Sequence, residues 1–163
     1  MTYPKNFEEL YKQFQPSLLN FAIYLTGSRP DALEIVNDVF LNVWDKRENL
    51  DLDDSLKGYL FSSVKNRTIN FHKKKRLKVV QDLPNDRVSD FSADRGLLEK
   101  EQSQIMLDIL ESLPPKCRQV FVMSRIDCLS YKEIAELMDI SVKTVEGQMS
   151  KALKVFRKKL LLK

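Results

Sequence analysis

Apolar side chains recur along the chain at the three- and four-residue spacing that is typical of amphipathic helices. In the first half this spacing predicts a helix from Phe7 and a second helix that begins at Pro16 and ends at Gly27. A third helix is expected to be capped by Ser28, and a fourth, beyond a polar loop, by Ser55. No stretch of this half alternates apolar and polar residues as a β-strand would.

The helical spacing is lost between the two halves. From residue 76 to about residue 95 the chain contains Pro84, Asn85 and two serines, which is the composition of a linker. The charge also changes sign, because residues 65–76 hold six cations and no acid, whereas residues 77–95 hold four aspartates against three cations. The expected fold is therefore all-α, with two small helical domains at residues 5–76 and 96–163 and a flexible linker at residues 77–95.

Beyond the linker, apolar residues from Leu97 to Leu113 predict one helix that Pro114 and Pro115 end, and a further helix contains Val120. Residues 129–153 then have the layout of a helix-turn-helix, the motif that places its second helix in the DNA major groove.

Local chemistry supports the helix-turn-helix. Ser130 is placed to cap the first helix, with Glu133 completing a capping box, and Ser141 is placed to cap the second helix. The second helix is expected to bury Val145, Met149, Ala152 and Leu153. Its opposite face should read DNA and consists of Lys143, Thr144, Glu146, Gly147, Gln148, Ser150 and Lys151. A basic tail follows, which suits phosphate contacts but equally a solvated helix end: Lys154, Arg157, Lys158, Lys159 and Lys163.

Composition narrows the class of protein. Only 4 of the 163 residues are glycine and 43% are apolar, so the chain should fold. Two cysteines and one histidine supply neither a disulfide framework nor a metal-ligand cluster, so we expect no metal and no cofactor. No catalytic constellation is clustered in the sequence, which disfavours an enzyme. The chain shows no signal-peptide pattern and no apolar run of about 18 residues, so a cytoplasmic setting without membrane insertion is expected.

Two segments of the first half carry a resemblance to a known family. They are Ala32 to Trp44 (ALEIVNDVFLNVW) and Gly58 to Arg67 (GYLFSSVKNR), and both resemble region 2 of the extracytoplasmic-function, or group 4, sigma factors of the sigma-70 family. Residues 110–161 resemble region 4 of the same family. The resemblance implies a non-enzymatic sigma factor that binds core RNA polymerase and directs promoter-specific initiation. Region 2 would read and melt the −10 element, and region 4 would read the −35 element.

The resemblance also implies roles for individual residues. In the family, the helix matching Ala32 to Trp44 docks on the polymerase β′ coiled coil, which gives as candidates Glu34, Asn37, Asp38, Asn42 and Trp44. Phe40 in the same helix is more simply explained as core. The loop at residues 47–56 and the helix after it match the −10 reader, with Tyr59, Phe61, Asn66, Arg67, Phe71, Lys73, Lys74, Lys75 and Arg76 as candidates. Core packing would also explain the spacing of Tyr59 and Phe71.

The partners implied are core RNA polymerase, through its β′ coiled coil and β flap, promoter DNA, and an anti-sigma factor that is soluble or membrane-anchored. The acidic linker matches a segment that threads through the polymerase, although an ordinary tether would have the same composition. Departures from the family are Leu33, where an acid is frequent, and Glu146 and Gln148, where some members carry arginines. One alternative stays open, since many stand-alone transcription regulators end in a similar helix-turn-helix.

Overall fold

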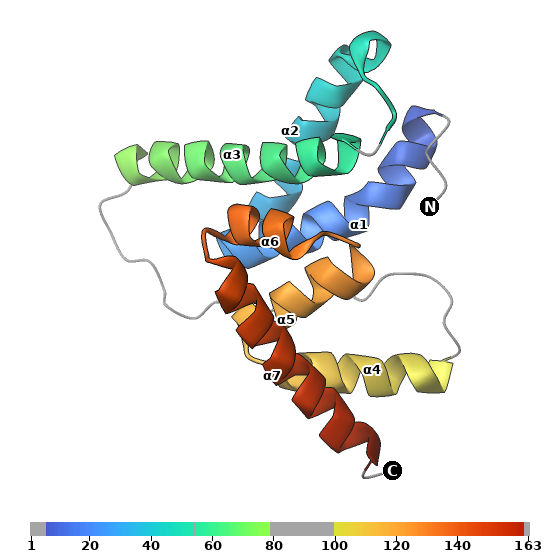
Figure 1. Cartoon of the computed structure of the whole chain (residues 1–163). Coiled ribbons are helices and arrows are strands. Elements are labelled where there is room, and N and C mark those ends of the chain that lie inside the picture. The colour runs from blue at the N-terminus through green and yellow to red at the C-terminus, as the bar shows by residue number, and fades with distance from the viewer. Residues whose placement is uncertain (1–5, 54, 79–99, 162–163) are drawn as a thin grey trace. The chain divides into compact units, whose positions relative to one another are not determined.

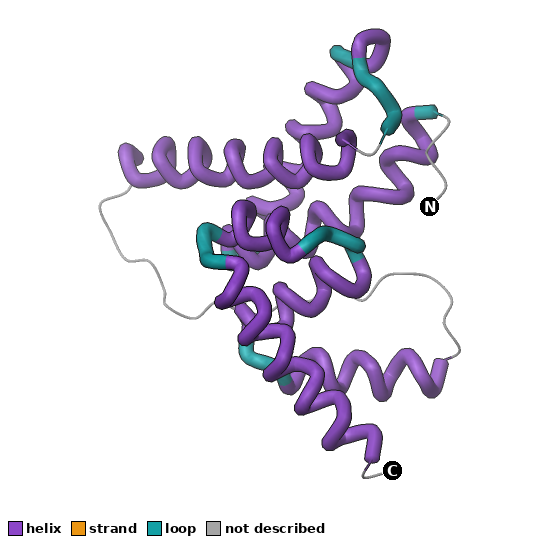
Figure 2. The backbone as a smooth tube through the Cα atoms, in the orientation of Figure 1, coloured by secondary structure: helices purple, strands orange, loops and turns teal. Residues whose placement is uncertain are grey.

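A computed structural model describes residues 6–53, 55–78 and 100–161. Among these residues the structure contains seven α-helices and no strand (Figures 1 and 2). The chain divides into two compact units, residues 1–92 and 93–163. The all-α class and the two helical domains are thus confirmed, while the predicted linker lies, beyond Lys78, outside the described residues.

The first unit is a three-helix core with one short turn of 3-10 helix. Each long helix packs against the other two. Fully buried side chains come from all three, for example Phe21, Val36 and Leu60, so the core lies where the three helices meet. The elements are α1 (Phe7–Thr26), α2 (Arg29–Asp45), the 3-10 helix η1 (Arg47–Asn49) and α3 (Ser55–Lys78).

The predicted break at Pro16 is wrong, because α1 runs through it without interruption. A proline inside a helix removes one backbone hydrogen bond and costs about 3 kcal/mol. Here the turns on either side bury Leu10, Phe14 and Leu18 against the other helices, and each such side chain is worth about 1.5–3 kcal/mol. Packing of the apolar face therefore outweighs the local cost of the proline.

Polar side chains fix the helix ends in the first unit. Gly27 ends α1 in the left-handed region at φ 69°, and the Ser28 hydroxyl accepts from the backbone N–H of Asp31 at 3.4 Å, both as predicted. Ser55 is not the cap of α3 but its first residue. The Asp53 carboxylate accepts from the backbone N–H of Ser55 at 2.9 Å and from its hydroxyl. These two bonds lower the pKa of Asp53 below its ordinary value.

The second unit buries its core around the last helix, which contacts α4, α5 and α6. Val120, Ile134 and Val145 are fully buried, and the rings of Phe121 and Phe156 stack with their centroids 4.5 Å apart. The elements are α4 (Lys100–Ser112), α5 (Pro115–Phe121), the π-helical turn η2 (Val122–Ile126), α6 (Tyr131–Met138) and α7 (Val142–Leu161).

The predicted buried stripe of α7 needs one correction. Val145, Met149 and Ala152 are buried, but Leu153 is 37% exposed and Phe156 takes its place in the core. The buried positions are spaced by four, three and four residues, which keeps them on one side of a helix, and Leu153 falls just off that line. The face opposite to this stripe is correspondingly open to solvent.

A buried arginine, which the sequence pattern did not reveal, joins α4 to α5. The guanidinium of Arg118 donates to the carbonyl oxygens of Leu110 at 2.8 Å, Glu111 at 3.0 Å and Leu113 at 3.0 Å. These carbonyls lie at or just beyond the C-terminal end of α4, where backbone donors become scarce, although the Leu110 carbonyl also accepts from the Leu113 N–H at 3.1 Å. Burial lowers the pKa of Arg118, and nearby Glu111 opposes the shift. The Arg118 guanidinium, a cation at the negative end of the α4 dipole, thus bonds carbonyls that water would otherwise satisfy.

Candidate polymerase and nucleic-acid interfaces

The outer face of α2 carries the residues predicted to dock on polymerase. Glu34, Asn37 and Asp38 are exposed along it, while the inner face, which includes Val36 and Val39, is buried. Phe40 is also buried, so its interpretation as a core residue is confirmed. The structure therefore separates an acidic and amide-bearing surface from the core along the whole length of this helix.

Two apolar side chains stand on the same surface. Trp44, one of the predicted residues, is 45% exposed, and its ring lies edge-on to Phe7 with centroids 4.9 Å apart. The Arg47 guanidinium sits 4.1 Å from the centre of the Trp44 ring and also donates to the Trp44 carbonyl oxygen at 2.8 Å. Leu41 is 62% exposed and was missed, although its place seven residues after Glu34 is the signal that could have found it.

The aromatic candidates of α3 divide between core and surface. Phe61 is 0% exposed, and its ring centroid lies 5.5 Å from that of Phe21, so it belongs to the core. Its assignment to DNA is wrong, because it falls on the side of α3 that α1 covers and a base could stack on it only by disrupting that packing. Tyr59 and Phe71 are half-buried, and the Lys75 ammonium lies 5.7 Å from the centre of the Phe71 ring.

The polar candidates of α3 lie at the surface. Asn66, Lys73 and Lys74 are exposed, whereas the Arg76 side chain is outside the described residues. Exposed Asn70 lies between Asn66 and Lys73 on the same face and was missed; its spacing of four residues from Asn66 is the signal. This face combines amides and cations, which are the groups that single-stranded DNA needs for base and backbone contacts.

We use the name polar seam for three polar contacts between described residues of α2 and α3. The Lys75 ammonium bonds the Asp31 carboxylate at 2.9 Å, the Arg67 guanidinium lies 3.8 Å from the Asp38 carboxylate, and the Asn42 amide donates to the Tyr59 hydroxyl at 3.5 Å. Early residues of α2 meet late residues of α3. Each contact links an α2 residue with a residue predicted to contact DNA.

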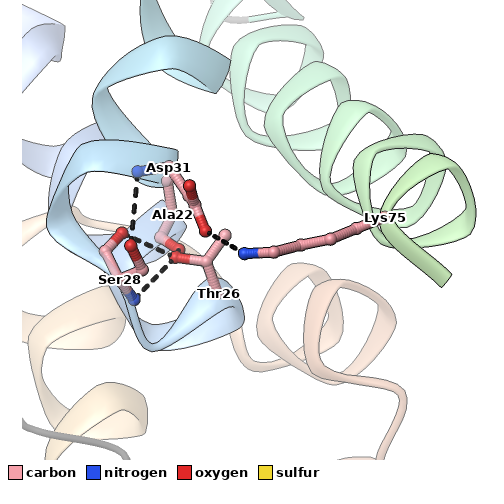
Figure 3. A network of polar contacts seen from close by, with 5 residues as sticks. All are labelled: Ala22, Thr26, Ser28, Asp31 and Lys75. Atoms are coloured by element: carbon pink, nitrogen blue, oxygen red, sulfur yellow. Dashed lines mark hydrogen bonds and ion pairs between the residues drawn. The ribbon is translucent and has the colours of Figure 1, made fainter. Parts of the chain in front are cut away.

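Figure 3 shows the first of these contacts and the turn that supports it. The Thr26 hydroxyl donates to the Ala22 carbonyl at 2.8 Å and contacts the Ser28 carbonyl at 3.0 Å, while Ser28 caps α2 beside Asp31. The extended side chain of Lys75 reaches across from α3 to the Asp31 carboxylate. The end of the basic helix is thereby tied to the beginning of the acidic one.

In the second unit, local hydrogen bonds build the helix-turn-helix as predicted. Ser130 and Glu133 form the reciprocal capping box, at 3.1 Å and 2.7 Å. Asp139 ends α6 in the left-handed region at φ 55°, where aspartate is among the better tolerated residues. The Ser141 hydroxyl accepts from the Thr144 backbone N–H at 3.0 Å and pairs with the Thr144 hydroxyl at 2.8 Å. The turn and the start of α7 are therefore fixed relative to each other.

The predicted DNA-reading face of α7 lies together on one side of the helix. Six of its seven residues are exposed, and they are Lys143, Thr144, Glu146, Gly147, Ser150 and Lys151. Gln148 is half-buried, and its carbonyl oxygen accepts from the thiol of buried Cys117 at 3.3 Å. Burial raises the pKa of Cys117, so the thiol stays protonated and can donate. The tail residues Lys154, Arg157, Lys158 and Lys159 are also exposed, and Lys163 is outside the described residues.

Gly147 is unusual because nothing in the packing requires it. A Cβ built there would meet no atom within 4 Å, and Gly147 has no positive φ. Glycine inside a helix costs about 0.5–1 kcal/mol relative to alanine. On an exposed helix face, such a glycine leaves room for close approach of a ligand to the backbone.

Two negative findings apply to the described part of the chain. No group of three or more His, Cys, Asp or Glu side chains there is arranged to hold a metal ion. None of the helices in these ranges combines the length and the apolar character needed to cross a membrane.

Two family models and several known proteins match this two-unit helical chain. Residues 10–78 match sigma-70 region 2, and residues 103–155 match sigma-70 region 4. The chain is 24% identical to the RNA polymerase sigma-E factor of Streptomyces avermitilis over 154 residues, which is 94% of this chain and 84% of that protein. It is 21% identical to the RNA polymerase sigma factor SigZ of Bacillus subtilis over 146 residues, with 90% and 82% covered.

Two further matches agree with these, one over a shorter stretch of sequence and one with a solved structure. The ECF RNA polymerase sigma-E factor of Salmonella typhimurium is 39% identical over 56 residues, which is 34% of this chain and 29% of that protein. The sigma factor RpoE of Bartonella quintana, solved in complex with the anti-sigma factor NepR, shares 20% identity and a TM-score of 0.55 over 96% of this chain and 98% of that one, and so has a similar fold.

The two units thus define a two-domain, helical, DNA-binding subunit of the transcription machinery. The chain belongs to the sigma-70 family and is an RNA polymerase sigma factor. Sigma region 2 occupies residues 10–78, where a stand-alone regulator would carry its sensing domain, so that alternative is set aside.

Proposed function

We propose that this sigma factor is of the extracytoplasmic-function type, that α2 docks on core polymerase, and that α3 and α7 read the −10 and −35 promoter elements. The observation that carries the proposal is the separation of faces. In each unit the helix expected to touch a partner buries one side in the core and presents polar and charged residues on the other. The order of the two units, region 2 before region 4, agrees with this division of work.

Docking on polymerase rests on the outer face of α2. Glu34 and Asp38 supply negative charge, Asn37 can both donate and accept, and Leu41 and Trp44 supply apolar area. A helix of this kind complements a helical partner that carries cations beside an apolar stripe. The β′ coiled coil of the polymerase is the partner we assign to it, and the β flap is the partner we assign to the second unit.

Promoter opening rests on α3. Flipping a base out of the duplex costs a few kcal/mol, which contacts to the released strand must recover. Exposed Asn66 can bond a base edge, and Lys73, Lys74 and Lys75 can contact the backbone, while Tyr59 and Phe71 are the remaining planar groups. Melting is then driven by binding, and this chain catalyses no reaction.

Reading of the −35 element rests on α7 in the major groove. Glu146 can accept a hydrogen bond from cytosine N4, and Gln148 can bond adenine, each such contact being worth about 1–3 kcal/mol of discrimination. Lys143 and Lys151 on the same side suit phosphate contacts. The element read should therefore differ from that of relatives with arginines at positions 146 and 148.

Control by an anti-sigma factor, soluble or membrane-anchored, is part of the proposal. Support comes from the similar fold of Bartonella quintana RpoE, which was solved with its anti-sigma factor NepR. An anti-sigma factor that covered the outer face of α2 would keep this chain, which we place in the cytoplasm, from docking on polymerase. Exposed Leu41 and Trp44 are the apolar groups that such a factor would bury.

In vitro transcription with core polymerase on a genomic promoter library tests the proposal directly. Purified core should gain initiation at a defined set of promoters only when the full chain is added. Asn66→Ala should impair open-complex formation more than it impairs recruitment of core. If core gains no promoter-specific initiation while the chain alone binds duplex operators tightly, the proposed division of work is wrong.

A further inference from the structure

A buried hydrogen bond ties α7 to α5, the helix against which it packs (Figure 1). The Cys117 thiol of α5 donates to the carbonyl oxygen of Gln148 at 3.3 Å, although the two residues are 31 positions apart in the sequence. Cys117 is only 1% exposed, so the thiol is shielded from water. It bonds the backbone of the residue whose side chain we assign to an adenine edge.

The Gln148 carbonyl does not need this thiol to be satisfied. In an α-helix the carbonyl of residue 148 already accepts from the backbone N–H of residue 152, four positions on. Burial raises the pKa of Cys117, and nearby Lys151 opposes the shift, so at neutral pH the group is a thiol, which is a weak donor. The bond is therefore a second, additional contact, and its effect is on where α7 lies against α5.

The remaining buried contacts of this part of α7 have little directional preference. Val145, Met149 and Ala152 are apolar, and the free energy of apolar burial depends on area rather than on angle. A hydrogen bond, in contrast, weakens steeply when its angle falls below about 120°. Rotation of α7 about its axis would keep part of the apolar burial but would move the Gln148 oxygen away from the Cys117 sulfur. The thiol thus opposes the rotation that would turn the reading face.

We infer that Cys117 is a positioning residue for promoter recognition, which fixes the rotation of α7 and thereby determines the base edge that Gln148 meets. The inference rests on the proposed reading of the −35 element by α7. Cys117 itself makes no contact with DNA, because its side chain is buried. Glu146 belongs to the same helix and would turn with Gln148. Replacing Cys117 should therefore change base preference without removing any DNA contact.

The size of the effect follows from the strength of one such bond. An intramolecular hydrogen bond is worth a factor of about two to ten in an equilibrium constant. The thiol is a weak donor, so we expect the lower half of that range, about two- to fivefold, in the discrimination between a correct and an incorrect base pair.

Anisotropy titrations of the full chain with fluorescent −35 duplexes, taken from a promoter that the chain activates, test the inference. Each duplex carries one changed base pair, and Gln148→Ala identifies the pair at which Gln148 discriminates. At that pair Cys117→Val, which keeps an apolar side chain but no donor, should lose about two- to fivefold of the discrimination. Cys117→Ser keeps a donor and should retain most of it. A duplex of scrambled sequence should bind equally to all Cys117 variants, because no phosphate contact is removed.

Infrared spectroscopy observes the hydrogen bond without any change at Cys117. The chain has two cysteines, so in Cys128→Ser protein the S–H stretching band belongs to Cys117. We expect this band at a lower frequency than that of a thiol without a hydrogen bond. A band at the frequency of a free thiol would overturn the inference, whether or not the Cys117 variants fold.

Three results of the titrations would also overturn it. The first is full discrimination in Cys117→Val. The second is an equal loss in Cys117→Val and Cys117→Ser, because packing rather than the donor would then explain the effect. The third is a loss of affinity for the scrambled duplex as large as that for the −35 duplex, which would indicate general damage to α7.

Gln148→Ala separates this inference from the proposed function. If this variant changes no base preference, the proposed reading by Gln148 is wrong, and the role of Cys117 is wrong with it. If it defines a base pair at which the Cys117 variants discriminate as well as the wild type, only the role of Cys117 is wrong.

Discussion

Both helices that we propose to face DNA rest on a buried core, but the polar contacts around them differ. In the second unit, buried groups position α7: Phe156 stacks on Phe121, and the Cys117 thiol bonds the Gln148 carbonyl. In the first unit, exposed or half-exposed polar pairs tie the cations of α3 to α2. Buried contacts are costly to break, whereas exposed ion pairs exchange easily with solvent or a ligand.

This difference suits the two tasks that we propose. A helix that reads duplex DNA by base edges needs a fixed geometry before it binds. A surface that captures a strand only after polymerase has docked benefits from contacts that a partner can replace. The described residues agree with this division, since no ion pair among them holds Lys143 or Lys151 of α7, whereas Arg67 and Lys75 of α3 are both paired.

Removing the stacked ring should have the largest effect on the second unit. Phe156→Ala is expected to reduce the free energy of unfolding by about 3–5 kcal/mol, because it leaves a cavity beside Phe121. Urea unfolding of the full chain, followed by circular dichroism, measures this. Leu153→Ala, at the exposed neighbouring position, should cost less than about 1 kcal/mol. Equal losses would mean that α7 is not held by a buried stripe.

The buried arginine should come next. Arg118→Leu is expected to cost about 2–4 kcal/mol, because the carbonyls of Leu110, Glu111 and Leu113 lose their charged donor. Arg118→Lys keeps the charge but not the planar fork, so it should lie between the wild type and Arg118→Leu. The same urea titration ranks the three proteins. A loss below about 0.5 kcal/mol for Arg118→Leu would show that water satisfies these carbonyls.

Gly147→Ala should separate stability from DNA reading. It is expected to raise the free energy of unfolding by about 0.5–1 kcal/mol, because alanine favours the helix and the added methyl meets no protein atom. The same methyl should weaken binding to a −35 duplex if the DNA backbone approaches the helix there. Unfolding and anisotropy titrations on one preparation measure both. Unchanged DNA affinity would place Gly147 outside the contact surface.

Local sequence signals predicted those parts of the structure that local contacts determine. The capping box of Ser130 and Glu133 and the cap at Ser141 join residues three apart, and all were found from spacing. The α7 face followed from helical periodicity, except that Leu153 was assigned to the core where the structure places Phe156. The break predicted at Pro16 failed because tertiary packing overrode a local rule.

Contacts between distant residues could not be predicted in this way. Asp31 and Lys75 are 44 residues apart, and nothing in either segment alone indicates their pairing. Arginine is usually exposed at the surface, and only the fold shows that Arg118 is buried. Phe61 likewise has the same chemistry as a stacking residue, and its place against Phe21 decides that it is core.

The smallest effect is expected at Asp53, where the first unit relies on an exposed contact. Bonds from Ser55 lower its pKa below the ordinary value of 3.8, so the carboxylate stabilises the start of α3 at neutral pH. Because the folded-state pKa is the lower one, this stabilisation is complete above about pH 4 and is lost as pH falls through the folded-state pKa. Asp53→Asn should therefore change the free energy of unfolding slightly at pH 7 and by less at pH 2.

Urea titrations at the two pH values measure this difference, and Asp51→Asn, an exposed carboxylate two residues earlier, is the matched control. A loss at pH 7 as large as that of Arg118→Leu would contradict the view that exposed polar contacts of the first unit contribute less than buried polar contacts of the second. A loss confined to neutral pH and much smaller than that of Arg118→Leu would instead place the start of α3 among the exchangeable contacts, together with the polar seam.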